Sequence, residues 1–269
     1  MSLFHYTDAS AVLSIIENKK LWLTDIRFMN DSDEALDGAK YVAEEIKALT
    51  SSGNVIVDQA LFHLQDFSID MVREGLAEQH AFIGSFSTRG DHLVQWRSYG
   101  NYAIEFHETL KDHFSPMEAC IYDIQVKEAL AKVLVGRARK AIADELLKYD
   151  DMDGYEISKA LWDLGDAVNL FKHQSFVDEN EIRVCRLETS HSDLIKYRVR
   201  NGIIVPYLEI GFEPRHIKAV HVGPMKNQEL AVASLKSFLN NFELRNIEKD
   251  IWSDFDIKVV PSSIPYREL

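Results

Sequence analysis

Two long helical stretches interrupt a series of short apolar segments, and this arrangement constrains the fold more than any other feature of the sequence. The short segments have the length and the apolar, β-branched character of strands. Helical periodicity instead fills residues 32–77 and 128–172. Because short strands outnumber regular strand–helix–strand repeats, the pattern favours an α+β fold over a doubly wound sheet. The predicted strands are 3–6, 21–24, 81–86, 102–106, 119–126, 182–187, 203–209, 217–222 and 257–260.

We therefore predict a single domain spanning residues 1–269. Mixed, mainly antiparallel sheets are expected to form a cleft, with helices inserted at about 32–77 and 128–172. A helix is also expected to follow Asp8 or Thr7, and another to follow Asp31 or Ser32, because these residue types cap helix N-termini.

Charge and composition narrow the class of partner. The chain has 269 residues, is 46% hydrophobic and carries a net charge of −13, so broad binding to nucleic-acid phosphates is not expected. One region, residues 183–200, is rich in arginine and is either a local anion site or a set of salt bridges. The sequence lacks an apolar run long enough for a membrane span and a secretory signal pattern, and Cys120 and Cys185 are expected to be reduced thiols. These features predict a cytoplasmic protein.

Motifs with a well-understood mechanism are missing. The sequence contains no GxGxxG, GxxxxGK[ST], HExxH or GxSxG pattern. Three acids in residues 150–153 resemble half of a calcium loop, but the closing glutamate is absent and a solvated turn is expected. His107 and His113 are six apart, which does not place them on one helical face. No metal site is predicted.

Polar residues instead gather at the edges of the predicted strands, from one end of the chain to the other. A packed core does not need such side chains at strand ends, whereas a polar cleft on a sheet does. The groups are His5-Tyr6-Thr7, Asn30-Asp31, Ser85-Phe86-Ser87-Thr88, Trp96-Arg97-Ser98-Tyr99, Glu179-Asn180-Glu181-Ile182-Arg183 and Ser263-Ile264-Pro265-Tyr266-Arg267.

The acidic pair Glu179 and Glu181 is the strongest candidate for chemistry. Residues two apart on an extended chain point to the same side, so both carboxylates and Arg183 are expected to face one cleft. Two acids held close together raise one another's pKa. We expect Glu181 to be partly buried within reach of Tyr, Ser or His side chains, with Glu179 closer to solvent. The alternative is a solvated strand end with an Arg–Glu pair.

Other candidates each have a structural alternative. His5 can donate to a ribose hydroxyl or satisfy a core contact, and Ser87 and Thr88 can bind a ligand or cap a turn. Trp96 and Tyr99 share a helical face and can stack on a flat ring or fill the core. If these residues form one site, a single concave surface should be lined by His5, Ser87, Trp96, Tyr99 and Glu181.

A nucleotide's pyrophosphate would need bidentate, permanently charged donors, which favours arginine over lysine. The candidates within the motifs are Arg97, Arg183 and Arg267.

Several stretches, taken together, resemble a bacterial family of unknown function. They are HYTDASAVLSIIENKKLWLTDIRFMND, FSTRGDHLVQWRSYG with AIEF, ENEIRV, RNGIIVPYLEI, AVHVGP and SSIPYR. The resemblance covers nearly the whole chain, and the combination is specific although each motif alone is weak. The chain departs from the family at Ile182, where a Trp is expected; this changes a packing residue and no polar one.

A more distant similarity is to ADP-ribosyltransferase folds. These place a His or Arg on the first strand, a Ser-Thr or Tyr on a second and an E-x-E on a third. The resemblance implies that His5 binds the nicotinamide ribose of NAD, and that Glu181 holds the ribose 2′-hydroxyl and stabilises a cationic transition state. It implies catalytic roles for Glu181, His5 and Tyr99. The implied NAD-binding residues are His5, Tyr6, Thr7, Ser87, Thr88, Trp96, Arg97, Glu179 and Arg183.

These observations predict NAD-dependent ADP-ribosyl transfer or NAD glycohydrolysis, with a nucleotide-like small molecule as partner. One alternative is a non-catalytic module that senses a nucleotide or nucleic acid, as in phage defence. Another is a phosphodiester-cleaving enzyme that uses His5 and Glu181 as acid and base. The acceptor and the oligomeric state are left open.

Overall fold

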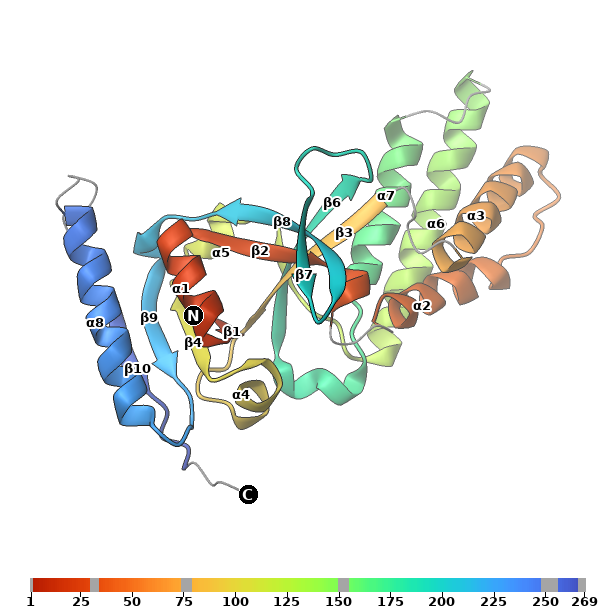
Figure 1. The fold of residues 1–269 in the computed structure, drawn as a ribbon. Helices are drawn as coiled ribbons and strands as arrows, with labels where there is room; N and C mark the ends of the chain where they lie inside the picture. The colour runs from red at the N-terminus through yellow and green to blue at the C-terminus, as the bar shows by residue number, and fades with distance from the viewer. Residues whose placement is uncertain (1, 30–33, 74–78, 150–154, 248–255, 266–269) are drawn as a thin grey trace.

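The computed structural model describes residues 2–29, 34–73, 79–149, 155–247 and 256–265 (Figure 1). It has an α+β fold, as predicted: a mixed and mostly antiparallel sheet is accompanied by helices at its ends and on its faces. Among the described helices, none is both long and apolar enough to cross a bilayer.

The sheet is an open one. Its strands lie in the order β10 (Lys258–Pro261), β9 (Ile217–Val222), β4 (Tyr102–Phe106), β1 (Leu3–Thr7), β3 (Gln79–Ser87), β2 (Lys20–Asp25), β8 (Ile203–Gly211) and β7 (Lys196–Arg200). Two further strands, β6 (Glu181–Thr189) and β5 (Met117–Ala119), extend it beside β3. The β10–β9 pair is parallel and the other strand pairs are antiparallel.

Strand β3 divides the sheet. Along one edge it pairs with β6 over its whole length, in a register that places Ser87 opposite Glu181. Its other edge is shared: β2 pairs at Phe82 and Ile83, and β1 pairs at Ser87. Between these points β1 and β2 diverge, and the sheet opens beside residues 84–86 of β3. This opening forms the cleft described below.

Four helices that connect the strands cover the sheet. The helix α1 (Ala9–Asn18) joins β1 to β2 and begins at Asp8, whose carboxylate accepts a hydrogen bond from the Ala11 backbone N–H at 2.8 Å. The others are α4 (Leu93–Tyr99), α5 (Leu110–His113) and α8 (Gln228–Ile247). The main core lies between α1, α8 and the sheet, and it includes Leu3, Ile16 and Val220.

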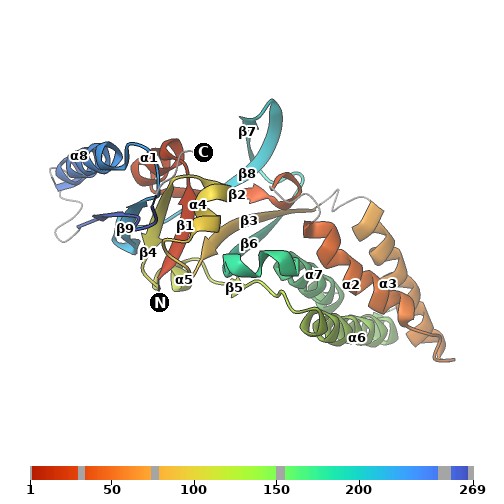
Figure 2. The same cartoon turned by 90° about the horizontal axis from the view of Figure 1, so that it is seen from below.

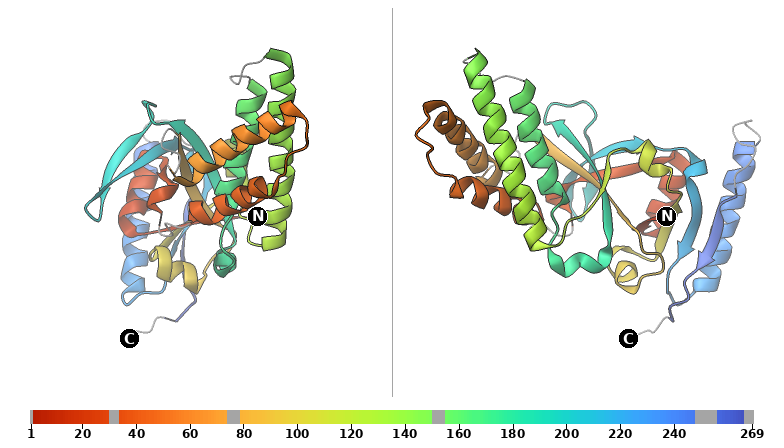
Figure 3. Two further views of the ribbon diagram at one scale, coloured as in Figure 1. Left: turned by 90° about the vertical axis from the view of Figure 1, so that its right-hand side faces the viewer. Right: turned by 180° about the vertical axis from the view of Figure 1, so that it is seen from behind.

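A second core belongs to four helices at one end of the molecule, opposite the end that carries α8 (Figures 2 and 3). They are α2 (Glu34–Ala48), α3 (Val55–Arg73), α6 (Ile124–Tyr149) and α7 (Tyr155–Leu170). They correspond to the two predicted helical insertions. The described residues also include three 3₁₀ helices: η1 (Ile26–Phe28), η2 (Gln174–Glu179) and η3 (Pro214–His216).

Two local predictions differ from the structure. The strand predicted at 119–126 is wrong, because β5 ends at Ala119 and α6 begins at Ile124; the Asp123 carboxylate accepts from the Val126 N–H and so starts a helix there. Strand β7 was not predicted, since its lysine and arginines interrupt the apolar pattern. The helix cap expected at Asp31 or Ser32 and the acidic turn at 150–153 lie outside the described residues.

Two glycines test the packing of this fold with the same substitution. At Gly84 in β3, a Cβ would lie 2.4 Å from Leu23 and 2.8 Å from Val184, both buried. At Gly136 in α6, a Cβ would meet nothing within 4 Å. We expect Gly84→Ala to lower the free energy of unfolding by roughly 1–3 kcal/mol through overpacking. The control, Gly136→Ala, should raise it by roughly 0.5–1 kcal/mol. Urea unfolding measures both, and equal effects at the two sites would contradict the packing around β3.

Candidate functional site

The cleft where β1 and β2 diverge has a volume of about 930 Å³. This lies at the upper end of the range of roughly 300–1,000 Å³ found for small-molecule sites. Strands β1, β2, β3 and β7, helix α4 and the segment that leads into β6 all contribute to its walls. Its polar lining is therefore assembled from positions spread over the sequence.

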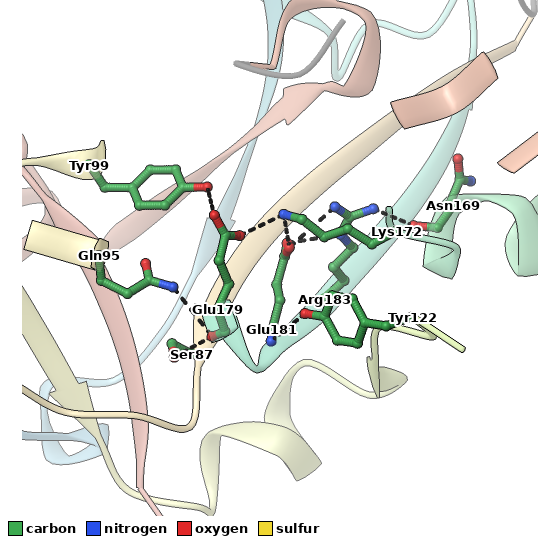
Figure 4. Close-up of polar contacts among 9 residues, drawn as sticks. All are labelled: Ser87, Gln95, Tyr99, Tyr122, Asn169, Lys172, Glu179, Glu181 and Arg183. Carbon is green, nitrogen blue, oxygen red and sulfur yellow. Dashed lines mark hydrogen bonds and ion pairs between the residues drawn. The ribbon is translucent and has the colours of Figure 1, made fainter. Parts of the chain in front are cut away.

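A buried lysine joins the two acids of the E-x-E motif (Figure 4). The Lys172 Nζ donates to Glu179 Oε2 at 2.7 Å and to Glu181 Oε2 at 2.6 Å. The three residues are only 3%, 5% and 4% exposed, and all line the cleft. Both carboxylates therefore face one cation at the cleft wall.

Arg183 completes the charge balance behind Glu181. Its Nε donates to Glu181 Oε1 at 2.8 Å, its Nη2 to Glu181 Oε2 at 3.2 Å and its Nη1 to the Asn169 carbonyl at 2.7 Å. Burial alone would raise the pKa of the Glu181 carboxyl. The charges and hydrogen bonds of Arg183 and Lys172 outweigh burial and lower that pKa to about 2. Glu181 is therefore ionised throughout the physiological pH range.

Glu179 has a different environment. The Tyr99 hydroxyl donates to its Oε1 at 3.0 Å, and its backbone carbonyl accepts from Ser87 Oγ at 2.6 Å and from Gln95 Nε2 at 3.3 Å. Burial raises the pKa of Tyr99, so this hydroxyl stays protonated and acts as a donor. Helix α4 thus supplies both Tyr99 and Gln95 to hold Glu179 at the cleft.

The backbone between the two acids is not extended. Glu179 ends η2, Asn180 adopts a left-handed conformation with φ of 49°, and Glu181 begins β6. The expectation that the two carboxylates share a side is confirmed, but the turn at Asn180 and the contact with Lys172 bring them together. The expectation that they raise one another's pKa is wrong for Glu181, because the cations lower it.

The remaining hydrogen-bonding capacity distinguishes the two acids. An ionised carboxylate has about four acceptor positions. Among the described residues, Glu181 accepts three hydrogen bonds at its carboxylate and Glu179 accepts two. Glu179 therefore retains more capacity to accept a hydroxyl of a ligand. The expectation that Glu179 lies closer to solvent is wrong, since both residues are about equally buried.

His5 faces the cleft from β1 as a neutral ring. Its Nδ1 lies 2.9 Å from the Ser85 carbonyl, which can only accept, so the ring proton resides on Nδ1. Burial lowers the pKa of His5, which keeps the ring uncharged. Nε2 is then an acceptor, so His5 can accept a hydrogen bond from a hydroxyl at that atom. The expectation was that His5 donates to a ribose hydroxyl, but its N–H already donates to the Ser85 carbonyl. The Ser85 hydroxyl beside it has no hydrogen-bond partner among the described residues.

The predicted concave surface is confirmed for His5, Ser87, Tyr99 and Glu181, which all line the cleft. It is wrong for Trp96, which is 3% exposed, packs edge-on against Tyr6 and donates from its indole N–H to Asp91. The apolar face of α4 thus goes to the core at Trp96.

The remaining predicted residues separate into two groups. Tyr6 and Thr7 line the cleft, although the Tyr6 hydroxyl donates to the Arg89 carbonyl. Thr88 is absent from the lining, and its N–H donates to the Asn180 carbonyl.

The predicted anion-binding arginines are not at the cleft. Arg97 is exposed but does not line it, and Arg183 is fully buried against Glu181 and Asn169. Arg267 lies outside the described residues. Neither Arg97 nor Arg183 therefore lines the cleft, and the expected anion contact by one of the three arginines stays a prediction. Arg198 and Lys20 line the cleft instead.

The sequence patterns missed Lys172 and Trp22, whereas Arg198 belongs to the arginine-rich region 183–200, for which either a local anion site or a set of salt bridges was expected. Lys172 stands just after α7, in a segment with no periodicity to mark it. Trp22 alternates with Leu21 and Leu23, so its outward orientation on β2 is a signal that strand alternation contains.

In the part of the chain that the structure covers, there is no group of three or more His, Cys, Asp or Glu side chains placed to hold a metal ion. A scan of protein-family models, a search of curated proteins and a search of solved structures each found no match for this chain.

Glu181→Gln tests whether the buried charges stabilise the fold. We expect this variant to lose roughly 3–5 kcal/mol of unfolding free energy near neutral pH, because Arg183 and Lys172 lose a buried counter-charge. The folded-state pKa of Glu181, about 2, lies below its ordinary value of 4.5. Its stabilising contribution is therefore present above pH 4.5 and is lost as the pH falls toward 2.

The difference in unfolding free energy between the wild type and Glu181→Gln should accordingly shrink over that acid range, as measured by urea unfolding at several pH values. The exposed Glu213, paired with Arg215, is the matched control, and Glu213→Gln should cost roughly 0–1 kcal/mol. A gap that stays constant with pH would contradict the assignment.

Proposed function

We propose that this protein consumes NAD, cleaving the bond between nicotinamide and ribose and passing ADP-ribose to an acceptor or to water. The observation that carries the proposal is the network of Tyr99, Glu179, Lys172 and Glu181, which opens into the same cleft as the neutral His5. It supplies two carboxylates, a hydroxyl donor and an imidazole acceptor around one space. A ribose that becomes cationic as its glycosidic bond breaks needs this kind of surroundings.

The proposed reaction breaks one bond and forms one. The bond from ribose C1′ to the pyridinium nitrogen breaks, and its electron pair passes to that nitrogen, so nicotinamide leaves as a neutral molecule. Water or an acceptor nucleophile then forms a bond to C1′ and releases one proton. The products are nicotinamide, ADP-ribose or its conjugate, and that proton.

Glu179 is the residue proposed to contact the ribose, because its carboxylate retains the larger acceptor capacity. Tyr99 and Lys172 hold that carboxylate in one orientation before the substrate binds. Preorganisation of this kind contributes to the rate because no reorganisation is needed during the reaction. Glu181, the residue favoured by sequence, then acts through Lys172 as a positioning residue. His5 Nε2 accepts from a ribose hydroxyl.

Of the two alternative functions, the phosphodiesterase fits this geometry less well. An acid–base phosphodiesterase would need one group that can donate a proton to the leaving group. Glu181 has a pKa of about 2 and is not protonated, and the neutral His5 ring donates its Nδ1–H to the Ser85 carbonyl. A sensing module would use the same cleft for binding alone. Two carboxylates and two cations balance in the network, an arrangement that is also suitable for binding.

Nicotinamide release from NAD tests the proposal. Purified protein is incubated with NAD, with and without added protein or nucleic-acid acceptors, and nicotinamide is measured by chromatography. We expect Glu179→Gln to lower the rate by about 10²-fold or more while NAD affinity changes little, since the carboxylate charge acts mainly in the transition state. Because Lys172 then loses one buried counter-charge, the rate is measured at a temperature at which circular dichroism shows the variant to be folded. Glu213→Gln, far from the cleft lining, should keep the wild-type rate.

Three results would contradict the proposal. NAD binding without nicotinamide release under any acceptor condition would support the sensing module. RNA breakdown without NAD would support the phosphodiesterase. Full activity in Glu179→Gln would remove that residue from the reaction.

A further inference from the structure

The part of the cleft formed by β2 and β7 has its own ligand chemistry. Trp22 and Thr24 come from β2, and Arg198 comes from β7. We propose that these residues form a subsite for a nucleoside diphosphate, with the base on the Trp22 indole and the phosphates at Arg198. The subsite rests on the proposed function only where the ligand is taken to be the ADP half of NAD.

Arg198 is held in place without a counter-charge. Its Nη2 donates to Thr24 Oγ1 at 2.8 Å, and its guanidinium carbon lies 5.0 Å from the Trp22 ring centre and 5.6 Å from that of Tyr207. Its Nε has no hydrogen-bond partner in the described chain, and no described carboxylate pairs with it. Arg27 and Arg183, by contrast, each bind a carboxylate. Arg198 therefore lines the cleft as a cation that no described carboxylate neutralises.

The aromatic residues around Arg198 are ordered by the sheet. Thr24 lies opposite Tyr207 in the β2–β8 register, and Trp22, two residues before Thr24, shares that face. The Trp22 and Tyr207 ring centres are 4.6 Å apart. Tyr207 is buried beneath, whereas Trp22 is 39% exposed. Trp22 therefore keeps exposed surface on which a flat ring can stack, beside the Arg198 guanidinium.

Charge favours an anion at this wall. Lys20 and Arg200 also line the cleft from β2 and β7, while the neighbouring carboxylate of Glu209 accepts from both Lys20 and Lys196. Burial and the nearby charge of Arg200 lower the pKa of Arg198, which is the response of a cation that has no anionic partner. A bound phosphate would offset both effects through bidentate hydrogen bonds.

The surroundings favour a small nucleotide over a nucleic acid. The chain carries a net charge of −13, and Glu179 and Glu181 line the same cleft. A long phosphate backbone would extend beyond the cleft across a protein of net negative charge, which opposes its binding. A nucleoside diphosphate needs only one base platform and one or two cationic donors, which the wall provides.

Binding of ADP tests the subsite directly. ADP and adenosine are titrated into the full chain by calorimetry, and tryptophan fluorescence is followed in parallel. We expect Arg198→Met to weaken ADP binding about tenfold or more and to leave adenosine binding nearly unchanged, because only the phosphate contact is lost. Trp22→Ala should weaken both ligands and remove the fluorescence change.

Matched controls lie elsewhere on the surface. Arg215→Met and Trp162→Phe change an exposed arginine and a half-exposed tryptophan that do not line the cleft, and both should bind ADP like the wild type. Arg198→Lys, which keeps the charge without the planar donor pair, should fall between the wild type and Arg198→Met. This variant provides a second measurement if Arg198→Met unfolds.

The outcomes separate this inference from the proposed function. Wild-type ADP affinity in Arg198→Met and Arg198→Lys would overturn the subsite. ADP binding that depends on Arg198, in a protein that never releases nicotinamide, would support the subsite and refute only the proposed reaction.

Discussion

The site depends on one buried cation between two buried anions. Removing Lys172 would leave Glu179 and Glu181 facing each other in a desolvated space, where an unpaired charge is strongly destabilising. A hydrogen bond to its backbone holds Lys172 in position: the Lys172 carbonyl accepts from Nζ of the buried Lys127 at 2.6 Å. Its neighbour Phe171 forms a parallel bridge to Ile121. The four-helix end of the molecule thus positions the charge that orients the acids of the cleft.

The cleft itself follows from how β3 shares its edge. Strand β2 pairs with the middle of β3, and β1 pairs with the end of β3. The backbone groups of residues 84–86 therefore lack a neighbouring strand on the edge of β3 that faces β1 and β2. The His5 ring occupies part of the gap and satisfies the Ser85 carbonyl that a strand would otherwise have bonded. A ligand that binds here would meet side chains from both halves of the sheet.

Strand and helix positions could be predicted because their signal is local. The apolar runs at 102–106 and 217–222 coincide with β4 and β9, and the helical insertions contain α2, α3, α6 and α7. The site could be predicted only in part, because its assembly depends on register and burial. Spacing correctly placed Arg183 beside Glu181, but spacing does not show that the arginine is buried behind it. The three-residue spacing between Trp96 and Tyr99 places both on one face of a helix. This spacing does not distinguish a tryptophan that packs in the core from one that stacks on a ligand. Lys172 follows a helix end, where no periodicity applies, and only the fold brings it to the acids.

The two proposals together define how NAD would be oriented in the cleft. Under these proposals, Glu179 accepts from a hydroxyl of the nicotinamide ribose, while Arg198 attracts the phosphates of NAD. Once the glycosidic bond breaks, nicotinamide is no longer joined to a group that the cleft holds, whereas ADP-ribose keeps its contacts at Glu179, Trp22 and Arg198. Nicotinamide should therefore leave first and ADP-ribose should remain as the slower product to dissociate. With ADP-ribose held at Trp22 and Arg198, the ribose C1′ would stay near Glu179 while an acceptor approaches. The same residues would then serve both bond cleavage and transfer.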